Sequence, residues 1–451
     1  MSGLIDKNKI ISFVSKNPLV DIVREVALSK KSNVYVVGGF IRDLILENRP
    51  VDIDFVVESD VKGFVEGVFK RIQGKLIVLG KEPLVNYRLV HRGAILDFVE
   101  AAGHDIHIDL SKRDFTMNAV ALNITSWELY DIFSGIKDIE AKIIREVSPA
   151  SMSDDPVRIM RGVRYISVMD GAKIEDETIC HMKEYSAGLS SSAPERVIDE
   201  LKKMCAGRYV GRGISLLFEI KAFEHLISSY MKDKIEHTSS LEEAKRFYLS
   251  KSIRSLMESR SSAVYRLLFC GETDKDADTE KIIIISSLFF LYKSVFDISE
   301  KVLGNIIKEM RFSNHYHKRI GNICSWAMEL KALAEKGCDE NELRLFIGRH
   351  GEDSYLSFVV LSACCVISGL ESARLKRIEE SFPHLIINEG RVLLNPEKLI
   401  SGDDIKKNYQ VNSPSDIGEM LSRIRDLQFQ GVIKTREEAL SFIQKIGRSN
   451  N

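Results

Sequence analysis

The segment VYVVGGFIRDLILENRPVDIDFVV, residues 34–57 of a 451-residue chain, decides the expected fold. A short apolar, β-branched run at 34–37 stops at two glycines, a helical pattern follows at 40–46, and a strand pattern covers 51–57. From about residue 146 onward, helical periodicity dominates and β-rich runs are few. We therefore expect an α+β protein with a small mixed β-sheet followed by an all-α remainder. Further strands are predicted at 76–79, 87–90, 94–99 and 119–124.

Two acidic residues interrupt the second strand pattern. Asp52 and Asp54 are two positions apart, so alternation along a strand turns both side chains to one face, while Ile53 and Phe55 turn to the other. Neighbouring carboxylates repel each other and raise each other's pKa unless a cation lies between them. Mg²⁺ meets that need, because it binds hard oxygen ligands and shares them with phosphates. The alternative is a solvated strand edge, the commoner meaning of an isolated Asp-x-Asp.

Three neighbouring features favour a phosphate and metal site. Gly38 and Gly39 lie between a strand and a helix, where bare backbone N–H groups can approach a phosphate. Arg42 in the first turn of that helix could reach a triphosphate. Asp97 lies in another apolar strand pattern, where a carboxylate is costly unless it is paired, hydrogen-bonded or metal-bound. Glu100 is the weaker candidate for a third carboxylate, because it turns to the opposite face from Asp97.

The segment SDDPVRIMRGVRYI, residues 153–166, predicts the start of a helix. Asp154 and Asp155 precede Pro156, which places acidic residues at the positive end of the helix and proline at its first position. Arginines at 158, 161 and 164 recur every three residues and form a stripe along one side. Taken alone, this segment favours a capped, solvated helix.

Several short segments resemble one known family. GGFIRD at 38–43 with DIDFVV at 52–57 is similar to the nucleotidyltransferase signature of the class II tRNA nucleotidyltransferases and the bacterial poly(A) polymerases. KRDFTMNA at 112–119 is similar to the second motif of that family, RRDFTxNA, with Lys112 in place of the first arginine. DDPVR at 154–158 resembles the nucleotide-selecting motif EDxxR, with Asp154 in place of glutamate.

This resemblance implies the roles of individual residues. Asp52, Asp54 and Asp97 would be catalytic and would hold two Mg²⁺ ions for an in-line displacement at phosphorus. Asp155 and Arg158 would hydrogen-bond the Watson–Crick edge of the incoming base, since a carboxylate accepts from an exocyclic amine and arginine donates to ring nitrogens and carbonyls. Arg113 would bind phosphate, and Asp114 would hold that arginine or a ribose hydroxyl. The implied nucleotide-binding residues are Gly38, Gly39, Arg42, Arg113, Asp114, Asn118, Asp155, Arg158 and Arg161.

The resemblance also extends over the helical part of the chain. Residues 130–139 resemble the family's hinge segment, and Glu195 with Arg196 resembles its motif E, which we interpret as structural. Segments at 399–405 and 431–439 resemble the C-terminal part of bacterial members, which cradles the tRNA acceptor arm. We therefore expect a catalytic head at 1–145, a helical neck at 146–220 with the nucleotide-selecting motif, and a tRNA-binding body and tail at 221–451. Weak candidates for tRNA contacts are Lys318, Arg319, Lys406 and Lys407.

The implied activity is template-independent transfer of C, with A left open, from CTP and ATP to the 3′ end of tRNA. Only 15 residues separate Asp97 from Arg113, where full CCA-adding relatives carry a longer flexible loop. CC addition alone is therefore a serious alternative. A poly(A) polymerase acting on RNA 3′ ends is a second alternative. A non-catalytic RNA-binding scaffold is a third, which the intact Asp-x-Asp disfavours.

Composition adds limits on location and partners. The 64 Lys and Arg residues balance the 65 Asp and Glu, so bulk charge alone gives no basic footprint for nucleic acid. The seven cysteines show no CxxC spacing, which indicates reduced thiols rather than a metal or disulfide framework. No apolar run reaches the ~20 residues that a bilayer span requires. We therefore expect a cytoplasmic protein with no membrane contact.

Overall fold

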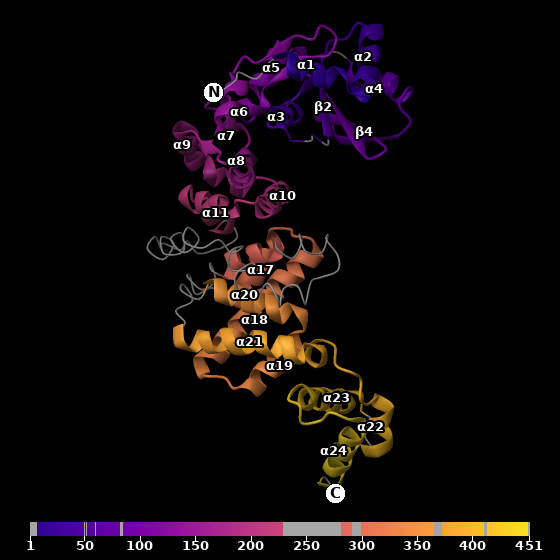
Figure 1. Ribbon diagram of the computed structural model, residues 1–451, viewed down its shortest axis with the longest axis vertical. Coiled ribbons are helices and arrows are strands. Elements are labelled where there is room, and N and C mark those ends of the chain that lie inside the picture. The colour runs from indigo at the N-terminus through magenta and orange to yellow at the C-terminus, as the bar shows by residue number, and fades with distance from the viewer. Residues whose placement is uncertain are drawn as a thin grey trace. The chain divides into compact units, whose positions relative to one another are not determined.

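The computed structural model describes residues 7–48, 50, 52–58, 60–81, 84–228, 281–290, 299–364, 372–409 and 413–449 (Figure 1). The chain divides into two compact units. The first comprises Met1–Glu200 and Glu219–Leu226, and the second comprises Leu201–Phe218 and Ile227–Asn451. Every residue expected to bind metal or nucleotide lies in the first unit, and every residue expected to contact tRNA lies in the second.

A seven-stranded sheet forms the core of the first unit. Strands β2 and β5 run parallel, and the remaining neighbours pair antiparallel, so the sheet is mixed as predicted. The predicted α+β class is thereby confirmed, and each predicted strand is present with small differences in its ends. In spatial order the strands are β3 (Lys75–Lys81), β4 (Leu84–His91), β5 (Ala94–Glu100), β2 (Asp52–Val57), β1 (Val34–Val37), β6 (Ala121–Asn123) and β7 (Leu129–Tyr130).

The two faces of the sheet differ because strand residues alternate between them. On one face Phe55 of β2 stacks on Phe98 of β5 with ring centroids 4.9 Å apart, and Phe64 of α4 (Val61–Phe69) lies 6.1 Å from Phe98. Helix α4 in turn packs against α2 (Pro18–Lys30), so this face is an apolar core. Helices α1 (Lys7–Ser15) and α3 (Gly39–Ile45) complete the N-terminal part of the unit.

The opposite face is apolar at one end and acidic at the other. Tyr35 and Val56 form a buried cluster with Ile106 and Leu110 of helix α5 (Ile106–Ser111). The same face continues along β2 and β5 to Asp54 and Asp97, and β2 begins at Asp52. The 3₁₀ turn η1 (Ala102–His104) and α5 occupy the short segment before the RDFTMNA motif. Helix α5 therefore covers the apolar end and leads the chain back toward the acidic end.

The neck of the first unit is mainly helical. The hinge-like segment is tied to the RDFTMNA motif, because Asp138 accepts hydrogen bonds from Thr116 at 2.7 Å and Arg145 at 3.0 Å. Helix α8 begins directly after Pro156, within one residue of the predicted start. The elements are η2 (Thr116–Asn118), α6 (Gly135–Ala141), β8 (Ile143–Ile144), α7 (Ser151–Asp154), α8 (Val157–Val168), β9 (Lys173–Ile174), α9 (Asp176–Tyr185), η3 (Ser186–Ser191) and α10 (Pro194–Cys205).

The remaining described elements are helices, as predicted for the rest of the chain. Ile400, Ile405, Ile433 and Ala439, all from the segments that resemble the family's C-terminal part, are buried in one hydrophobic cluster of the last three helices. These segments therefore supply a core. The helices are α11 (Val210–Glu219), α12 (Ala222–Ser228), α17 (Glu300–Glu309), α18 (Asn314–Lys336), α19 (Glu340–His350), α20 (Glu352–Cys364), α21 (Ser372–Leu394), α22 (Gly402–Tyr409), α23 (Pro414–Phe429) and α24 (Arg436–Ser449).

The most apolar part of the sequence is buried within this helical unit. Residues 282–290 are helical and buried, and residues 358–362 are buried within α20. Among the described residues, we find no helix with the length and apolar character needed to cross a membrane.

Candidate active site

Strand register brings the predicted carboxylates to one place on the sheet. Asp54 of β2 is directly paired with Asp97 of β5, and Asp52 precedes Asp54 by two residues on the same face. Asp52 is exposed, Asp54 is half-buried, and Asp97 is buried with 7% of its surface exposed. The three carboxylates therefore become more buried from Asp52, where β2 begins, through Asp54 to Asp97.

Asp54 lies in an environment that disfavours its charge. Burial raises the pKa of Asp54 first, and the neighbouring carboxylates of Asp97 and Asp52 raise it further, while Arg113 and Arg88 oppose the shift. The net direction is upward, so the surrounding protein supplies less positive charge than this carboxylate needs. A bound cation would relieve the same imbalance.

Asp97 has a partner that the sequence analysis missed. Arg88, directly opposite Asp97 in the β4–β5 ladder, donates to both of its carboxylate oxygens at 2.8 and 2.7 Å. Within the part of the chain that the structure describes, no three His, Cys, Asp or Glu side chains come together as a metal-binding group. Arg88 therefore already pairs with the charge of Asp97, the third carboxylate expected to bind metal. The alternation of Arg88 with Tyr87 and Leu89 was the available signal, but its use requires the strand register.

Gly38 brings the phosphate-binding turn to the carboxylates. Its φ of +68° is strained for other residues, and a Cβ atom there would lie 2.9 Å from Nη1 of Arg113 and 3.9 Å from Oδ2 of Asp54. Glycine is thus required both by the backbone conformation and by the close approach of these side chains. Gly38, Asp54 and Arg113, which the sequence predicted from separate motifs, meet at this point.

Arg42 is fixed within the protein at several of its N–H groups. Its Nε and Nη2 atoms donate to Asp43 at 3.0 and 2.8 Å, and its Nη1 atom donates to Oδ1 of Asn118 at 2.7 Å. A Cβ atom on Gly39 would lie 3.5 Å from Nη2 of Arg42. The absence of a side chain at Gly39 therefore leaves Nη2 of Arg42 next to bare backbone, in a side chain of which 14% is exposed.

Arg113 and Asp114 have different partners from those expected. Arg113 is held by Asp109, one turn earlier on α5, at 3.1 and 3.0 Å, and donates to the backbone oxygen of Asn118 at 3.2 Å. Asp114 is buried and instead binds Arg161 at 2.7 Å. The expectation that Asp114 holds Arg113 is wrong, because successive residues point in different directions here. The four-residue spacing from Asp109 to Arg113 was a signal for their pairing.

Asp114 is charged although it is buried. Burial raises its pKa, but the guanidinium of Arg161 and N–H donors from Asn118 and Phe115 lower it, and the net shift is downward. Oδ1 accepts from Nδ2 of Asn118 at 2.9 Å and from the Phe115 N–H at 2.8 Å. Asp114 and Asn118 are both at most 6% exposed. Their side chains therefore contact neighbouring protein groups, including the arginines, rather than solvent.

The nucleotide-selecting motif lies where α7 ends and α8 begins. Asp155 accepts two hydrogen bonds from Arg196 of α10, at 3.1 and 2.7 Å. Arg158 donates to Oγ of Ser151 at 3.0 Å and to the backbone oxygens of Lys112 at 2.5 Å and Arg113 at 3.4 Å. Arg158 therefore connects the neck to the RDFTMNA motif, and Arg196 from motif E reaches the motif it was not expected to contact.

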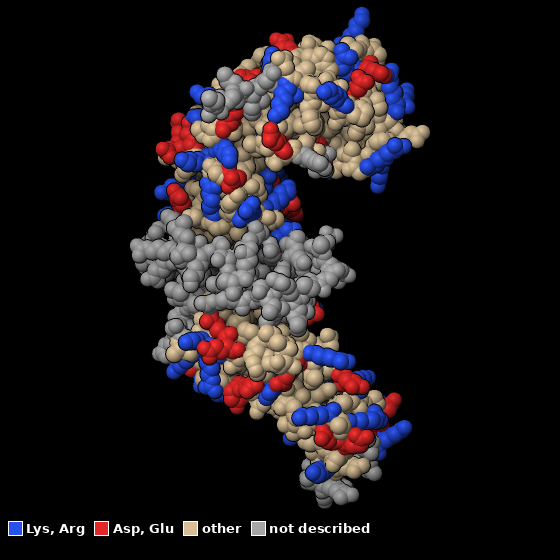
Figure 2. All heavy atoms as spheres, viewed as in Figure 1, with Lys and Arg blue, Asp and Glu red and all other residues tan. Residues whose placement is uncertain are grey.

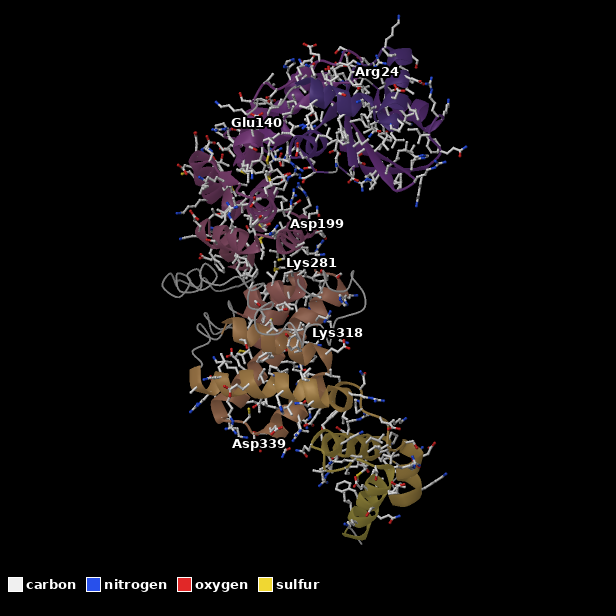
Figure 3. All side chains as sticks on the ribbon, in the orientation of Figure 1. Arg24, Glu140, Asp199, Lys281, Lys318 and Asp339 are labelled. Atoms are coloured by element: carbon white, nitrogen blue, oxygen red, sulfur yellow. The ribbon has the colours of Figure 1, made fainter. Side chains whose placement is uncertain are left out.

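The basic residues expected to contact tRNA differ in their surroundings. Lys318, labelled in Figure 3, and Lys407 are exposed. Arg319 is instead half-buried and forms an ion pair with Asp353 of α20. Lys406 lies 3.7 Å from Asp403 on the same helix and stays about half exposed. Lys318 and the α22 lysines thus remain accessible, while Arg319 supports helix packing.

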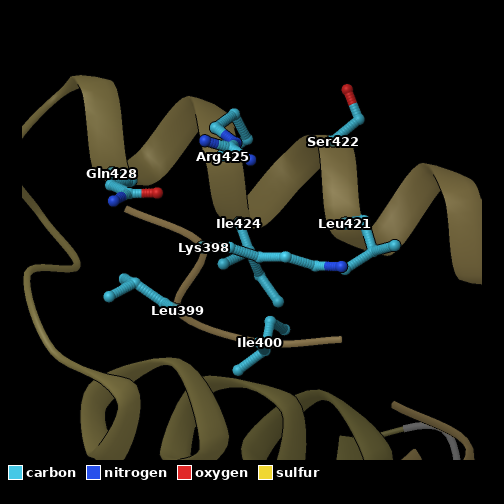
Figure 4. A pocket seen from close by; sticks show the side chains of 8 residues that line it. All are labelled: Lys398, Leu399, Ile400, Leu421, Ser422, Ile424, Arg425 and Gln428. Carbon is cyan, nitrogen blue, oxygen red and sulfur yellow. The ribbon is translucent and has the colours of Figure 1, made fainter. Parts of the chain in front are cut away.

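A small pocket lies beside α23 in the same helical unit. It has a volume of about 260 Å³ and is lined by Lys398, Ile400, Leu421, Arg425 and neighbouring residues. Figure 4 shows the Lys398 side chain extending across the pocket toward Leu421. Arg425 donates to the backbone oxygen of Pro396 at 3.2 Å. On the face drawn in Figure 2, basic and acidic side chains are interspersed, in keeping with the balanced composition.

Two family models match separate segments of the chain. Residues 34–145 match the model described as "Poly A polymerase head domain", and residues 171–233 match "Probable RNA and SrmB- binding site of polymerase A". The chain is 24% identical to a CC-adding tRNA nucleotidyltransferase of Synechocystis sp., over 92% of this chain and 94% of that protein. It is 26% identical to a CCA-adding enzyme of Bacillus cereus, over 91% and 94%. These matches support the resemblance of the chain to the class II tRNA nucleotidyltransferases.

Solved structures support the same fold for this nucleotidyltransferase. A CCA-adding enzyme solved with CTP matches it with a TM-score of 0.70, over 98% of both chains, at 22% sequence identity. The head-domain model covers Gly38, Asp54, Asp97 and Arg113, which are the residues that meet at the acidic end of the sheet. The matched head domain therefore contains the acidic end of the sheet, where the pKa of Asp54 is raised.

Proposed function

We propose that this nucleotidyltransferase transfers CMP units from CTP to the 3′ end of tRNA and releases pyrophosphate. The observation that carries the proposal is the meeting of Gly38, Asp54 and Arg113 beside the Asp54–Asp97 register. The 3′ oxygen of the RNA attacks the α-phosphorus, and the bond from that phosphorus to the pyrophosphate oxygen breaks. The names of the relatives, which add C or CCA to tRNA, support this substrate.

The carboxylates fit a site for Mg²⁺. The raised pKa of Asp54, caused by burial and by neighbouring carboxylates, reflects a local excess of negative charge that a hard cation would balance. We infer that Asp52 and Asp54 would hold the metal, and that Asp97 would join them only after releasing Arg88. When bound, Mg²⁺ would neutralise triphosphate charge and lower the pKa of the attacking hydroxyl.

The arginines of the head would bind and orient the triphosphate. Arg113 is held at the Gly38 turn by Asp109, and Arg42 presents its Nη2 edge at Gly39. Because Gly38 and Gly39 have no side chains, the backbone N–H groups of this turn and the guanidinium groups of Arg42 and Arg113 can approach one phosphate together. Asn118 would position both arginines, because its backbone oxygen accepts from Arg113 and its Oδ1 accepts from Arg42, and Asp114 would hold the amide of Asn118.

The base would be read at the start of α8. Asp155 is already oriented by Arg196, and Arg158 is oriented by backbone oxygens of the RDFTMNA motif. Cytosine offers an amine donor next to ring and carbonyl acceptors, which these two side chains complement. To hydrogen-bond the base, Asp155 and Arg158 must each release some of their present partners.

We propose that the head at 1–145 carries catalysis and that the neck at 146–220 selects the nucleotide. The body and tail at 221–451 would bind tRNA, with Lys318, Lys406 and Lys407 as phosphate contacts. Cytoplasm is the expected location, where tRNA and CTP are both present.

We further infer that addition stops after C residues. Between β5 and Arg113 the chain forms only η1 and α5, whose residues pack under the sheet and hold Arg113. The described segment between β5 and Arg113 contains no longer loop that could swing to admit a second kind of nucleotide. This favours CC addition over full CCA addition.

The experiment uses purified protein, Mg²⁺ and labelled single nucleotides with tRNA ending before CCA, after the first C, or after CC. We expect CMP incorporation into the first two substrates and no AMP incorporation into the third. AMP added to the third substrate would reject CC-restricted addition while keeping the family activity. Long A tails would identify a poly(A) polymerase, and an absence of any incorporation would reject the enzymatic proposal.

A further inference from the structure

Tyr165 is a buried tyrosine at the contact between the head and the nucleotide-selecting helix. It lies on α8, one turn after Arg161, and only 3% of its surface is exposed. Its ring packs edge-on against Phe115 of the RDFTMNA motif, with centroids 5.7 Å apart. No motif in the sequence singled it out, although Arg42, Asn118 and Arg161, which donate to its hydroxyl, were all expected to bind nucleotide.

The Tyr165 hydroxyl is shared by three N–H donors. Nη1 of Arg42 lies 3.2 Å from it, Nδ2 of Asn118 lies 3.1 Å from it, and Nη2 of Arg161 lies 3.4 Å from it. The amide orientation of Asn118 is fixed independently, because its Oδ1 accepts from Arg42 and its Nδ2 also donates to Asp114. The hydroxyl oxygen thus acts as an acceptor for a cation from the head and a cation from the neck.

These contacts close into a ring of four hydrogen bonds and one ion pair, which joins Asp114 and Arg161. Arg42 binds Asn118, Asn118 binds Asp114, Asp114 binds Arg161, and both arginines meet at the Tyr165 oxygen. Four of the five members are residues that the sequence predicted from three separate motifs. The fifth, Tyr165, is the only neutral acceptor between the two guanidinium groups among these members.

The electrostatics explain why an oxygen is needed there. The guanidinium carbons of Arg164 and Arg42 lie 4.2 and 5.1 Å from the ring centroid of Tyr165. The aromatic ring of Tyr165 therefore also contacts positively charged groups. Burial and Asp114 raise the pKa of Tyr165, but Arg161, Arg42 and Arg164 lower it more, and the net shift is downward. Without the hydroxyl, Arg42 and Arg161 would face each other across an apolar ring edge.

The hydroxyl also completes the fixation of Arg42. Both contacts of Nη1 are internal, to Asn118 and to Tyr165, while Nε and Nη2 bind Asp43. This arrangement also holds Nη2, which binds Asp43, beside the bare Gly39 turn. Loss of one Nη1 partner would let Arg42 rotate away from the place where a triphosphate would bind.

We propose that Tyr165 is a positioning residue whose hydroxyl couples the triphosphate-binding Arg42 of the head to the nucleotide-selecting helix α8. This inference rests on the proposed function, because it takes Arg42 as a triphosphate contact. Tyr165 itself touches no reacting atom. It sets the orientation in which Arg42 meets CTP.

The test compares Tyr165→Phe with wild-type protein on a tRNA ending before CCA. Phenylalanine keeps the ring contacts and removes only the oxygen. We expect KM for CTP to rise about tenfold, as for loss of a hydrogen bond to a charged group, while kcat changes less than about threefold. Equilibrium dialysis of CTP without tRNA should show the same weakening, independently of turnover.

Tyr35→Phe provides the matched control. Tyr35 is also buried in the head, and its hydroxyl donates to Glu58 at 2.9 Å, outside the ring of residues around Tyr165. This variant should leave KM for CTP unchanged. An equal rise in KM for both variants would overturn the proposal, because loss of any buried hydroxyl in the head would then suffice.

A double-mutant cycle tests whether Tyr165 acts through Arg42. Arg42→Lys should weaken CTP binding by itself, and adding Tyr165→Phe should weaken it by less than about twofold more. Additive losses, an unchanged KM in Tyr165→Phe, or failure of Tyr165→Phe to fold would each overturn the inference. Inactivity of the wild-type protein with CTP and tRNA would instead reject the proposed function.

Discussion

At the scale of single residues, Asp54 carries the most specific expectation. It lies beside Gly38 and is paired with Asp97, and burial with neighbouring carboxylates raises its pKa. Asp54→Asn should lower CMP transfer by at least about 1000-fold, since an amide cannot replace a metal-binding carboxylate. Single-turnover incorporation on tRNA ending before CCA measures this. Activity within tenfold of wild type would refute the assignment of Asp54 to the metal.

The same residue predicts how stability depends on pH. Because burial and neighbouring carboxylates raise the pKa of Asp54 in the folded state, the unfolded chain releases that proton first as pH rises. Asp54 therefore costs stability above the ordinary value of Asp, about 3.9, and costs nothing below it. Asp54→Asn should raise the melting temperature at pH 7 and not at pH 3.5. Asp52→Asn, at the exposed neighbour, should abolish transfer with little change in melting temperature.

At the scale of elements, the β4–β5 ladder places Arg88 against Asp97. Arg88→Ala would leave a 7%-exposed carboxylate without its bidentate partner and should cost about 1–2 kcal/mol of unfolding free energy, since Arg88 is partly solvated. The freed Asp97 should also strengthen Mn²⁺ binding, measured by electron paramagnetic resonance without nucleotide. Arg71→Ala, from an exposed pair with Glu25, is the stability control. Unchanged or weaker Mn²⁺ binding would exclude competition between Arg88 and metal for Asp97.

The contact between α8 and α10 carries a prediction about base choice. Arg196 of motif E holds Asp155 through two hydrogen bonds, which lysine cannot reproduce. Arg196→Lys should reduce the preference for CTP over UTP by about tenfold, through a mispositioned Asp155. Competition between labelled CTP and UTP measures that preference. If discrimination stays at the wild-type level, Arg196 only braces the neck, as its sequence motif suggested.

How far the sequence could be interpreted depends on the kind of contact. Alternation along β2 correctly placed Asp52 and Asp54 on one face, because strand periodicity is local, whereas the pairing of Asp97 with Asp54 follows from the strand register. The partners of Asp97 and Asp155 could not be predicted. Arg88 contacts Asp97 because of the strand register, and Arg196 contacts Asp155 across about 40 residues of chain. Tyr165 gave no signal at all, since its role depends on three donors that come from different elements.

At the scale of the whole molecule, balanced charge makes tRNA binding depend on a few accessible lysines. Net charge is −1, and Arg319, one of the four expected contacts, is committed to Asp353. Lys406 and Lys407 lie together on α22, in the tail unit whose core is formed by the last three helices. Few phosphate contacts imply modest affinity with a shallow salt dependence, which suits release after short additions.

A paired charge reversal tests that view. Lys406→Glu with Lys407→Glu should weaken tRNA binding at least about tenfold at 0.1 M salt and make the salt dependence less steep, because two phosphate contacts are lost. Filter binding across a salt series measures both, and CTP binding to free protein should not change, since both lysines belong to the second unit and the acidic end of the sheet belongs to the first. The matched control is Lys301→Glu with Lys308→Glu, two exposed lysines on α17. Equal weakening in both pairs would mean that α22 contributes only through bulk charge, and unchanged affinity in the α22 pair would remove it from the tRNA-binding surface.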